Sequence, residues 1–311
     1  MTWHKLEYGM RKDLIDLNCE RNAETNDLLE SFAGHREKVM QLVSATVAQL
    51  SQNGGTCSSA VLLGSGNCLD VDLPALADMF SKIHLVDLDE SASKAAVEAS
   101  GVSPDQISIH APEDIAEPLL SLTSRDFRPE EENKEHCIKV LQALSSENGL
   151  ADIPEADVVV SQCVFTQLID ALSRIIDKDH PAFANTLKAL RIGHLRRLVS
   201  MLRPGGVAIF VTDLVSSDTA PGLRTTTDES LGDTIKELVN QRNFFSGTNP
   251  SMVLNDLNVL SRLPSGPETV HTIDPWLWDV GQRRYAVYAL RIQKRIPLPV
   301  EEMPAEADTQ M

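Results

Sequence analysis

The chain has 311 residues, of which 28 are Lys or Arg and 45 are Asp or Glu, so its formal net charge is −17. Hydrophobic residues make up 42% of it, enough to bury a substantial core. Because this excess of negative charge repels phosphate backbones, we expect no nucleic-acid partner. No stretch approaches 18 consecutive apolar residues, and no apolar signal-peptide core follows the N-terminus, so we expect neither membrane insertion nor secretion.

Cysteine and histidine usage points to the same compartment. The five cysteines are widely spaced without a C-x-x-C pair, and the eight histidines include no H-x-x-x-H pair. This pattern is typical of reduced thiols in a cytoplasmic protein and supplies no cluster for a zinc site. We therefore expect a cytoplasmic protein that holds no metal.

Hydrophobic periodicity predicts alternating helices and strands along the chain. Apolar residues at three- and four-residue steps predict a helix over residues 23–50, which the turn formers of Ser51–Gly55 end. Short apolar runs predict five buried strands, at residues 60–63, 83–86, 107–110, 157–160 and 207–211. Helical patterns lie between them, at residues 73–80, 91–99, 136–144 and 183–202.

The C-terminal part adds a helix and two strands. A helix is predicted at residues 231–241, and residues 285–292 alternate like a strand whose partner lies at residues 270–279. The helix at 183–202 has a basic side, formed by Lys188, Arg191, Arg196 and Arg197, which we interpret as a solvated face.

The order of these elements predicts the fold class. Strands that alternate with helices imply a mostly parallel sheet covered on both faces, that is, a doubly wound α/β domain. We assign residues 1–52 to an N-terminal helical addition and residues 53–295 to this domain, with possible insertions at 115–152 and 214–265. Residues 296–311 are expected to form a disordered acidic tail.

A glycine turn and an acidic strand end indicate a ligand site. The strand at 60–63 leads into Gly64-Ser65-Gly66, a turn that lets the backbone approach a ligand, and the next helix aims its N-terminal amides there. Asp87 follows the next strand, where a carboxylate can accept hydrogen bonds from both ribose hydroxyls. Together these features predict a nucleoside-type ligand.

Enzymes of several classes have a comparable constellation. A nicotinamide dehydrogenase would need a third glycine where Leu69 stands. Asp87 and Asp89 would suit a haloacid-dehalogenase-like phosphatase or a metal-dependent glycosyltransferase, in which both carboxylates would bind a metal. Neither of these two classes accounts for the preceding glycine turn.

Four segments, taken in order, resemble class I S-adenosylmethionine-dependent methyltransferases: Val61–Asp70, Leu85–Asp89, Ala156–Gln162 and Leu202–Phe210. They match the family's glycine loop, the acidic end of its second strand, its fourth strand and its fifth strand. The resemblance extends over roughly residues 55–292 and includes a closing strand pair. It implies a seven-stranded Rossmann-like methyltransferase fold and S-adenosylmethionine as cofactor.

The resemblance also assigns the cofactor-binding residues. Gly64, Ser65 and Gly66 would lie against the methionyl and ribose portions of S-adenosylmethionine. Asp87 would bind the ribose hydroxyls, and Leu88 would pack on the adenine ring.

Two further pairs of residues complete this assignment. Asp114, or its neighbour Glu113, would meet the adenine amino group after the third strand. Ser161 and Gln162 would sit near the methionyl group and the transferred methyl.

The chain departs from the family pattern at two positions. Leu62 stands where the family often has an acidic residue, and Cys68 replaces the third glycine of the loop. These departures keep a second hypothesis open, namely a non-catalytic protein that binds S-adenosylmethionine or another nucleoside.

Methyl transfer is an in-line displacement on a carbon already activated by the sulfonium, so it chiefly requires alignment of the acceptor, and no residue identifies itself as a general base. Asp213, His180 and Cys163 are candidates near the opening, and we leave the catalytic residue unassigned. The acidic composition favours a small-molecule acceptor. Residues outside the shared core, including Phe244–Pro250 as a pocket wall or lid, are expected to select it.

Overall fold

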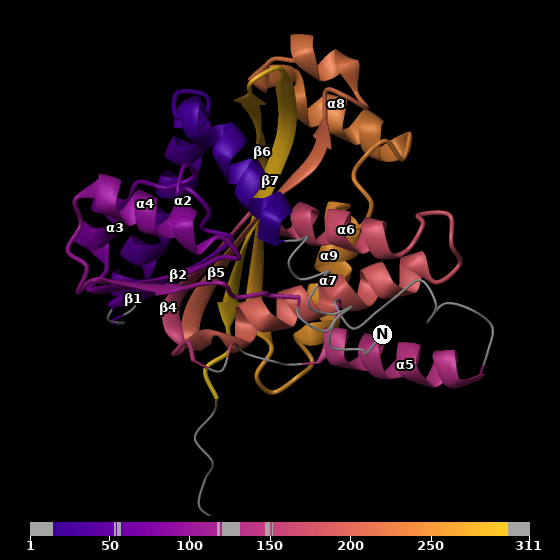
Figure 1. Ribbon diagram of the computed structural model, residues 1–311, viewed down its shortest axis with the longest axis horizontal. Helices are drawn as coiled ribbons and strands as arrows, with labels where there is room; N and C mark the ends of the chain where they lie inside the picture. The colour runs from indigo at the N-terminus through magenta and orange to yellow at the C-terminus, as the bar shows by residue number, and fades with distance from the viewer. Residues whose placement is uncertain are drawn as a thin grey trace, which may run out of the picture.

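The computed structural model describes residues 15–52, 54, 57–116, 119, 131–146, 150 and 152–297. Its centre is a seven-stranded sheet in the order β3-β2-β1-β4-β5-β7-β6 (Figure 1). Among the described strands, β7 runs in one direction and the other six run in the opposite direction. The strands are β1 Ser59–Leu63, β2 Lys82–Val86, β3 Ile107–His110, β4 Ala156–Gln162, β5 Leu202–Ser216, β6 Pro267–Val280 and β7 Arg283–Lys294.

Helices cover both faces of the sheet, so the doubly wound α/β fold predicted from the sequence is confirmed. One apolar core joins the sheet to α5, α6, α7, α8 and α9, and a second joins it to α2, α3 and α4. The helices are α2 Ala33–Gln52, α3 Leu73–Met79, α4 Glu90–Ser100, α5 Glu131–Ser145, α6 Val164–Ile175, α7 Phe183–Ser200, α8 Asp228–Asn240 and α9 Pro250–Leu260. A further helix at residues 15–25 and the short 3-10 turns η1 Asn26–Leu28 and η3 Pro221–Thr225 are also described.

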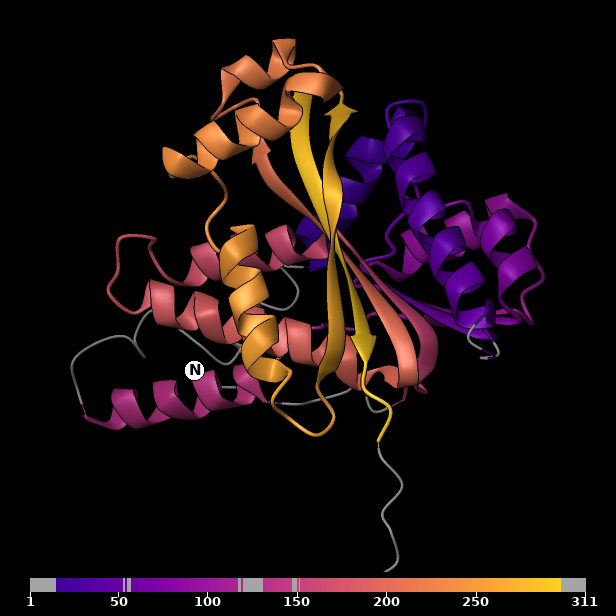
Figure 2. The ribbon, with the colours of Figure 1, turned by 180° about the vertical axis from the view of Figure 1, so that it is seen from behind.

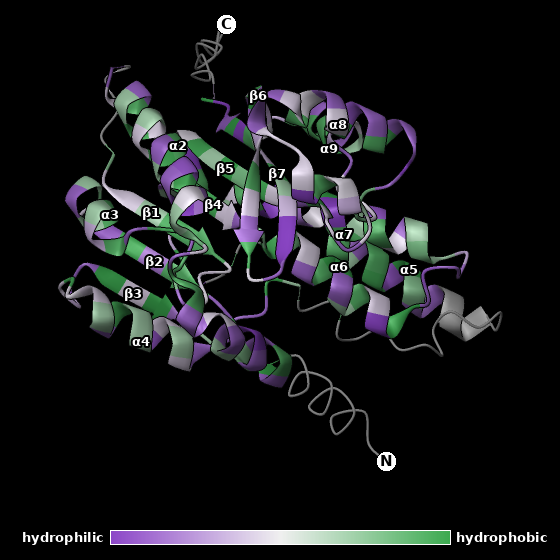
Figure 3. Ribbon diagram, turned by 90° about the horizontal axis from the view of Figure 1, so that it is seen from above, coloured by the Kyte–Doolittle hydropathy of each residue, from purple (hydrophilic) through white to green (hydrophobic). Residues whose placement is uncertain are grey.

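The central strands are buried on both faces, which explains their uninterrupted apolar runs. Every residue of β1 and β4 is buried. Figure 3 shows hydrophobic stretches in β2, β3 and β5, and a mixture of hydrophobic and hydrophilic residues along the helices. Within the described residues, no helix combines the length and apolar composition needed to cross a membrane.

The N-terminal helical segment differs from the prediction of one helix at residues 23–50. Residues 15–25 form a separate helix, and the chain turns through η1 before α2 begins at Ala33. The Thr25 hydroxyl donates to the carbonyls of Arg21 and Asn22 at 3.1 Å, where the first helix ends. The break lets this helix cross the carboxyl ends of the strands.

Two helices and part of one strand were missed by the sequence analysis. Helices α6 and α9 contribute to the first core, and their buried residues recur at three- and four-residue steps, so this signal was present in the sequence. Strand β5 begins at Leu202, ahead of the predicted strand at 207–211, and its pairing with β4 is irregular between Ala156 and Val158. The predicted acidic tail falls, from residue 298 on, outside the described residues, as do the charged residues 125–130.

The expected solvated basic face of α7 is wrong for Arg191. Its side chain is 2% exposed, and its Nε donates to Asp256 Oδ2 of α9 at 2.7 Å. Arg196 also turns inward and donates to the Ser145 carbonyl at 2.6 Å. Because α7 is covered by α5 and α9, these two arginines find partners within the protein, whereas Lys188 remains exposed.

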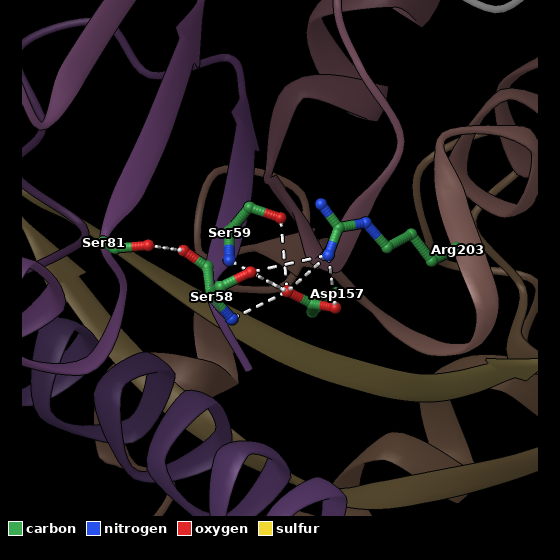
Figure 4. A network of polar contacts seen from close by, with 5 residues as sticks. All are labelled: Ser58, Ser59, Ser81, Asp157 and Arg203. Carbon is green, nitrogen blue, oxygen red and sulfur yellow. Dashed lines mark hydrogen bonds and ion pairs between the residues drawn. The ribbon is translucent and has the colours of Figure 1, made fainter. Parts of the chain in front are cut away.

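The Asp157 side chain connects the amino ends of β1, β4 and β5 through polar contacts (Figure 4). These contacts lie at the opposite end of the sheet from the glycine turn. Its Oδ2 accepts from the backbone N–H groups of Ser58 and Ser59 at 2.7 and 2.9 Å. Arg203 Nη1 lies 3.3 Å from Oδ1. Burial raises the pKa of this carboxyl, but the N–H donors and Arg203 outweigh burial, so the pKa lies below its ordinary value.

We expect Asp157→Asn to lower the free energy of unfolding at neutral pH by about 1.5–3 kcal/mol, the worth of a hydrogen bond to a charged group. A depressed pKa means that the carboxylate stabilises the fold above the unfolded-state pKa. This contribution is lost as pH falls through the folded-state pKa. Denaturant titrations of both proteins at pH 7 and at acidic pH should therefore show the difference shrinking in acid.

The control for this experiment is Asp233→Asn, because Asp233 is exposed and paired only at the surface with Lys236. It should change stability little at either pH. A difference between wild type and Asp157→Asn that stays constant with pH would contradict the role of the charge.

Candidate functional site

The glycine turn lies where β1 meets α6. The N–H groups of Gly64 and Ser65 donate to the carbonyl of Val86, the last residue of β2, at 2.9 and 3.2 Å. Gly64 has φ +73°, and a Cβ added there would lie 2.7 Å from Val164 Cβ. Gly66 also has a positive φ, +44°. Since only glycine combines this conformation with so close an approach, the turn is fixed by its residue types.

The two residues that depart from the family pattern, Leu62 and Cys68, are both buried. Leu62 is fully buried in the second core, so its position holds an apolar packing residue. Cys68 is buried with φ +54°, the left-handed conformation that a glycine would adopt without strain.

Asp87 directly follows β2 and is held against the turn. Its Oδ2 accepts from the Gly66 N–H at 2.7 Å, and its Oδ1 accepts from the Asp89 N–H at 2.9 Å. Burial raises the pKa of this carboxyl, and the two N–H groups oppose the rise. Each carboxylate oxygen has a further lone-pair site, so Asp87 can accept hydrogen bonds from two ligand hydroxyls.

Asp89 has a different task. It is the N-cap of α4 and accepts from Ala92 N–H at 3.0 Å, while its other oxygen accepts from Asn22 Nδ2 at 3.0 Å. Burial raises the pKa of this carboxyl, but the donors Ser91, Asn22 and Ala92 bring it below its ordinary value. Asp87 and Asp89 thus have separate partners, and among the described residues no group of three His, Cys, Asp or Glu side chains gathers to hold a metal.

Two cavities meet at Gly64 and Asp87. The narrow one, about 60 Å³, has apolar walls from residues such as Ile115 and Leu168. The wide one, about 840 Å³, lies within the size range of small-molecule sites. A nucleoside bound at Asp87 can therefore extend in two directions.

The predicted site residues distribute between these cavities. Gly64 and Asp87 line both; Leu88, Glu113 and Asp114 line the narrow cavity; Ser65, Gly66 and Gln162 line the wide one. The structure therefore brings eight of the nine together at the carboxyl ends of β1, β2, β3 and β4.

Ser161 lines neither cavity. It is fully buried, and its Oγ lies 2.9 Å from Nε2 of His194 on α7. Side chains alternate along a strand, so Ser161 and Gln162 point to opposite faces of β4. Only Gln162 faces the wide cavity.

Of the three general-base candidates, Asp213 and Cys163 line the wide cavity. His180 lines neither cavity, and its Nδ1 accepts from the Ala182 N–H at 3.1 Å just before α7.

The helix of residues 15–25 also contributes to the site, and the sequence analysis did not foresee this. Asn67 of the glycine loop donates to the Asn22 carbonyl at 2.6 Å. Arg21 binds Asp170 of α6 at 2.6 Å. Figure 1 shows this helix, in deep blue, crossing the carboxyl ends of the strands. Its polar contacts come from positions far apart in the sequence, so no local motif could have revealed them.

The far wall of the wide cavity comes from the β6–β7 hairpin, which Figure 2 shows as two long twisted strands, and from the segment after α8. Trp278 stacks on His35 with ring centroids 4.1 Å apart, and Trp276 Nε1 donates to His35 Nδ1 at 3.1 Å. The expected pocket wall at Phe244–Pro250 contributes Phe244 and Phe245.

No protein-family model matches the chain, and no curated protein matches it significantly. Similar solved structures are mostly S-adenosylmethionine-dependent methyltransferases. A putative S-adenosyl-L-methionine-dependent methyltransferase from Methanococcus maripaludis is 16% identical, with 93% of this chain and 95% of that chain covered and a TM-score of 0.40.

Two further similar structures share less sequence. Magnesium protoporphyrin IX methyltransferase from Synechocystis, solved with bound S-adenosylhomocysteine, is 12% identical over 81% of this chain and 82% of that one, with a TM-score of 0.36. A putative methyltransferase from Bacillus halodurans is 12% identical over 81% of this chain and 99% of that one, with a TM-score of 0.38.

Proposed function

We propose that the protein is a methyltransferase that uses S-adenosylmethionine and methylates a small molecule. The observation that carries this proposal is the placement of Asp87. Its carboxylate is hydrogen-bonded to the Gly66 N–H, at the junction of a narrow apolar cavity and a wide one. A nucleoside with an extended polar substituent fits such a junction.

The residues at the junction suit the parts of the cofactor. Asp87 binds the ribose hydroxyls, and the side-chain-free surface of Gly64 and Gly66 admits the ribose and methionyl portions. Leu88 packs on adenine, beside Glu113 and Asp114. Since about 60 Å³ accommodates only two or so water molecules, we expect the narrow cavity to widen when adenine enters.

The protein's part in the reaction is alignment and exclusion of water. The cofactor supplies a methyl group already activated on a sulfonium, and the transfer is an in-line displacement. The helix of residues 15–25 covers one side of the site through Arg21–Asp170 and Asn22–Asp89 contacts, which restricts access of water. The wide cavity orients the acceptor.

Two features support a small-molecule acceptor over a nucleic acid or a membrane component. The cavity of about 840 Å³ matches a small organic ligand in size. The net charge of −17 disfavours polyanionic partners and anionic lipid surfaces.

We expect S-adenosylhomocysteine to raise the melting temperature, while NADH has little effect. A ligand that binds only the native state at a hundred times its dissociation constant stabilises it by about 2.7 kcal/mol. Differential scanning fluorimetry over a ligand series measures the shift. A shift with NADH and none with S-adenosylhomocysteine would exclude the proposed cofactor in favour of a nicotinamide.

Two further experiments distinguish the proposed methyltransferase from a metal-dependent enzyme and from a non-catalytic binding protein. Binding should persist in EDTA, whereas loss in EDTA and recovery with Mg²⁺ would favour a metal site at Asp87 and Asp89. Incubation of S-adenosylmethionine with a metabolite pool should produce S-adenosylhomocysteine. Binding without such turnover would favour a non-catalytic nucleoside-binding protein.

A further inference from the structure

Two buried polar side chains that line the wide cavity have polar atoms without a hydrogen-bond partner among the described residues. Gln162 is 2% exposed, and neither atom of its amide has a partner. Asp213 is 8% exposed; its Oδ2 accepts from Thr166 Oγ1 at 3.0 Å, but its Oδ1 has no partner. A buried polar atom left unpaired destabilises the protein, so a ligand that hydrogen-bonds to these atoms would gain affinity from pairing them.

The sheet brings these two residues together. Gln162 ends β4 and is the register partner of Val211 in β5. Asp213 lies two residues further along β5, on the same face as Val211 because side chains alternate. Both residues line the wide cavity, which also reaches Gly66 and Asp87.

The charge of the wide cavity is predominantly negative. Among the described residues that line it, five are acidic and three are basic. Two of the three cations already have partners, Arg21 with Asp170 at 2.6 Å and Arg283 with Asp218 at 2.8 Å. Such a lining attracts a cation and repels a carboxylate or phosphate ligand.

Aromatic rings also line this cavity. Trp278 lies 5.0 Å from Phe32 and 5.6 Å from Tyr285, measured between ring centroids, and Phe244 and Phe245 are further lining residues. Aromatic faces bind ammonium groups through their quadrupoles and bury apolar or aromatic bodies.

We propose that the methyl acceptor is an amine carried on an aromatic or apolar body, and that Asp213 is a catalytic residue that accepts its proton. Gln162 supplies a second polar contact to the amine. This proposal rests on the proposed function and specifies its acceptor. The aromatic rings hold the body of the acceptor, while Asp213 holds the nitrogen.

The chemistry balances without any further reactant. An ammonium acceptor gives one proton to Asp213 Oδ1 and becomes a neutral amine. The nitrogen lone pair then forms a bond to the methyl carbon of S-adenosylmethionine, and the carbon–sulfur bond breaks with its electron pair returning to sulfur. The products are the methylated ammonium and S-adenosylhomocysteine, and Asp213 later releases its proton to water.

The surroundings of Asp213 suit a proton acceptor for an amine. Burial raises the pKa of its carboxyl, while hydrogen bonds from Cys163 and Thr166 oppose the rise. The titratable groups that face it are Cys163 after β4, His35 of α2, Asp70 before α3 and Tyr285 of β7. A carboxylate with a raised pKa is a better base than an exposed one.

The test measures binding of three molecules matched in shape to the full-length protein: 2-phenylethylamine, 2-phenylethanol and phenylacetate. Isothermal titration at pH 7 is run with and without saturating S-adenosylhomocysteine. We expect the amine to bind at least about tenfold more tightly than the alcohol, since one charged hydrogen bond exceeds 1.4 kcal/mol. An amine that binds no better than the alcohol or the carboxylate overturns the proposal.

Three variants test which residues cause the preference for the amine over the alcohol. Asp213→Asn keeps an oxygen for Thr166 and should reduce the preference to about threefold or less, with affinity for S-adenosylhomocysteine retained. Gln162→Leu should weaken amine binding while raising the melting temperature, because it removes an unpaired amide. This variant keeps the test valid if Asp213→Asn is unstable. The control is Asp279→Asn. Asp279 is next to Trp278 in the sequence, but 60% of its side chain is exposed, so this substitution should leave the preference for the amine unchanged.

The outcomes distinguish this proposal from the one on which it rests. If the preference for the amine persists in both Asp213→Asn and Gln162→Leu, these two residues do not bind the amine, and the proposal is overturned. A preference that depends on these residues in a protein that binds no S-adenosylhomocysteine confirms the amine site and rejects methyl transfer. Binding of S-adenosylhomocysteine without amine preference retains the proposed function and rejects the amine.

Discussion

We expect Gly64→Ala to lower the free energy of unfolding by about 2–5 kcal/mol and to abolish measurable S-adenosylhomocysteine binding. Left-handed backbone costs a residue with a Cβ about 1–2 kcal/mol, and overpacking costs about 1–3 kcal/mol. Both apply, because Gly64 has φ +73° and its added Cβ would lie 2.7 Å from Val164 Cβ. Denaturant titration and calorimetry measure the two effects.

Two variants control for this substitution. Gly232→Ala places a methyl group in open space on α8 and should stabilise the protein by about 1 kcal/mol, through helix propensity alone. Adding Val164→Ala to Gly64→Ala removes the Cγ2 contact at 2.9 Å but keeps Cβ at 2.7 Å, so it should restore only a small part of the stability. Wild-type stability and binding in Gly64→Ala would show that α6 does not constrain the turn.

Asp87→Ala is expected to weaken S-adenosylhomocysteine binding by at least about tenfold, because hydrogen bonds to a charged group contribute about 1.5–3 kcal/mol. It should also lower the melting temperature, since Asp87 holds the N–H groups of Gly66 and Asp89. Calorimetric titration of the folded variant measures the affinity. Unchanged affinity would remove the nucleoside from this position.

Asp89→Ala provides the matched control, two residues away. It removes the N-cap of α4, which should cost about 1 kcal/mol of stability with little effect on affinity. Equal and large losses of affinity in both variants would instead indicate carboxylates that share one metal.

The sequence alone was sufficient to predict the central strands and to place the Gly64–Gly66 turn beside Asp87. Strands β1, β2, β4 and β5 are buried on both faces, so their apolar runs are continuous and visible in the sequence. The Gly64–Gly66 turn and Asp87 could be predicted because each depends on a neighbouring strand end. The need for glycine in the turn and for a carboxylate at the strand end arises from the conformation and position of those residues themselves.

Other features depend on segments that meet only in the folded chain. Arg191 has the pattern of a surface residue, but α9 supplies Asp256 and covers it. The helix of residues 15–25 reaches Asp89 and Asp170 across long stretches of sequence. Local periodicity carries no information about either contact.

The wide cavity is the clearest case of a feature that the tertiary structure decided. Gln162 and Asp213 are separated in sequence, and strand pairing places them on one face of the sheet. The β6–β7 hairpin brings Trp278 and Tyr285 to the same cavity. Turn chemistry and burial act between neighbours and can be read from the sequence, whereas the shape and charge of a cavity depend on which distant side chains packing brings together.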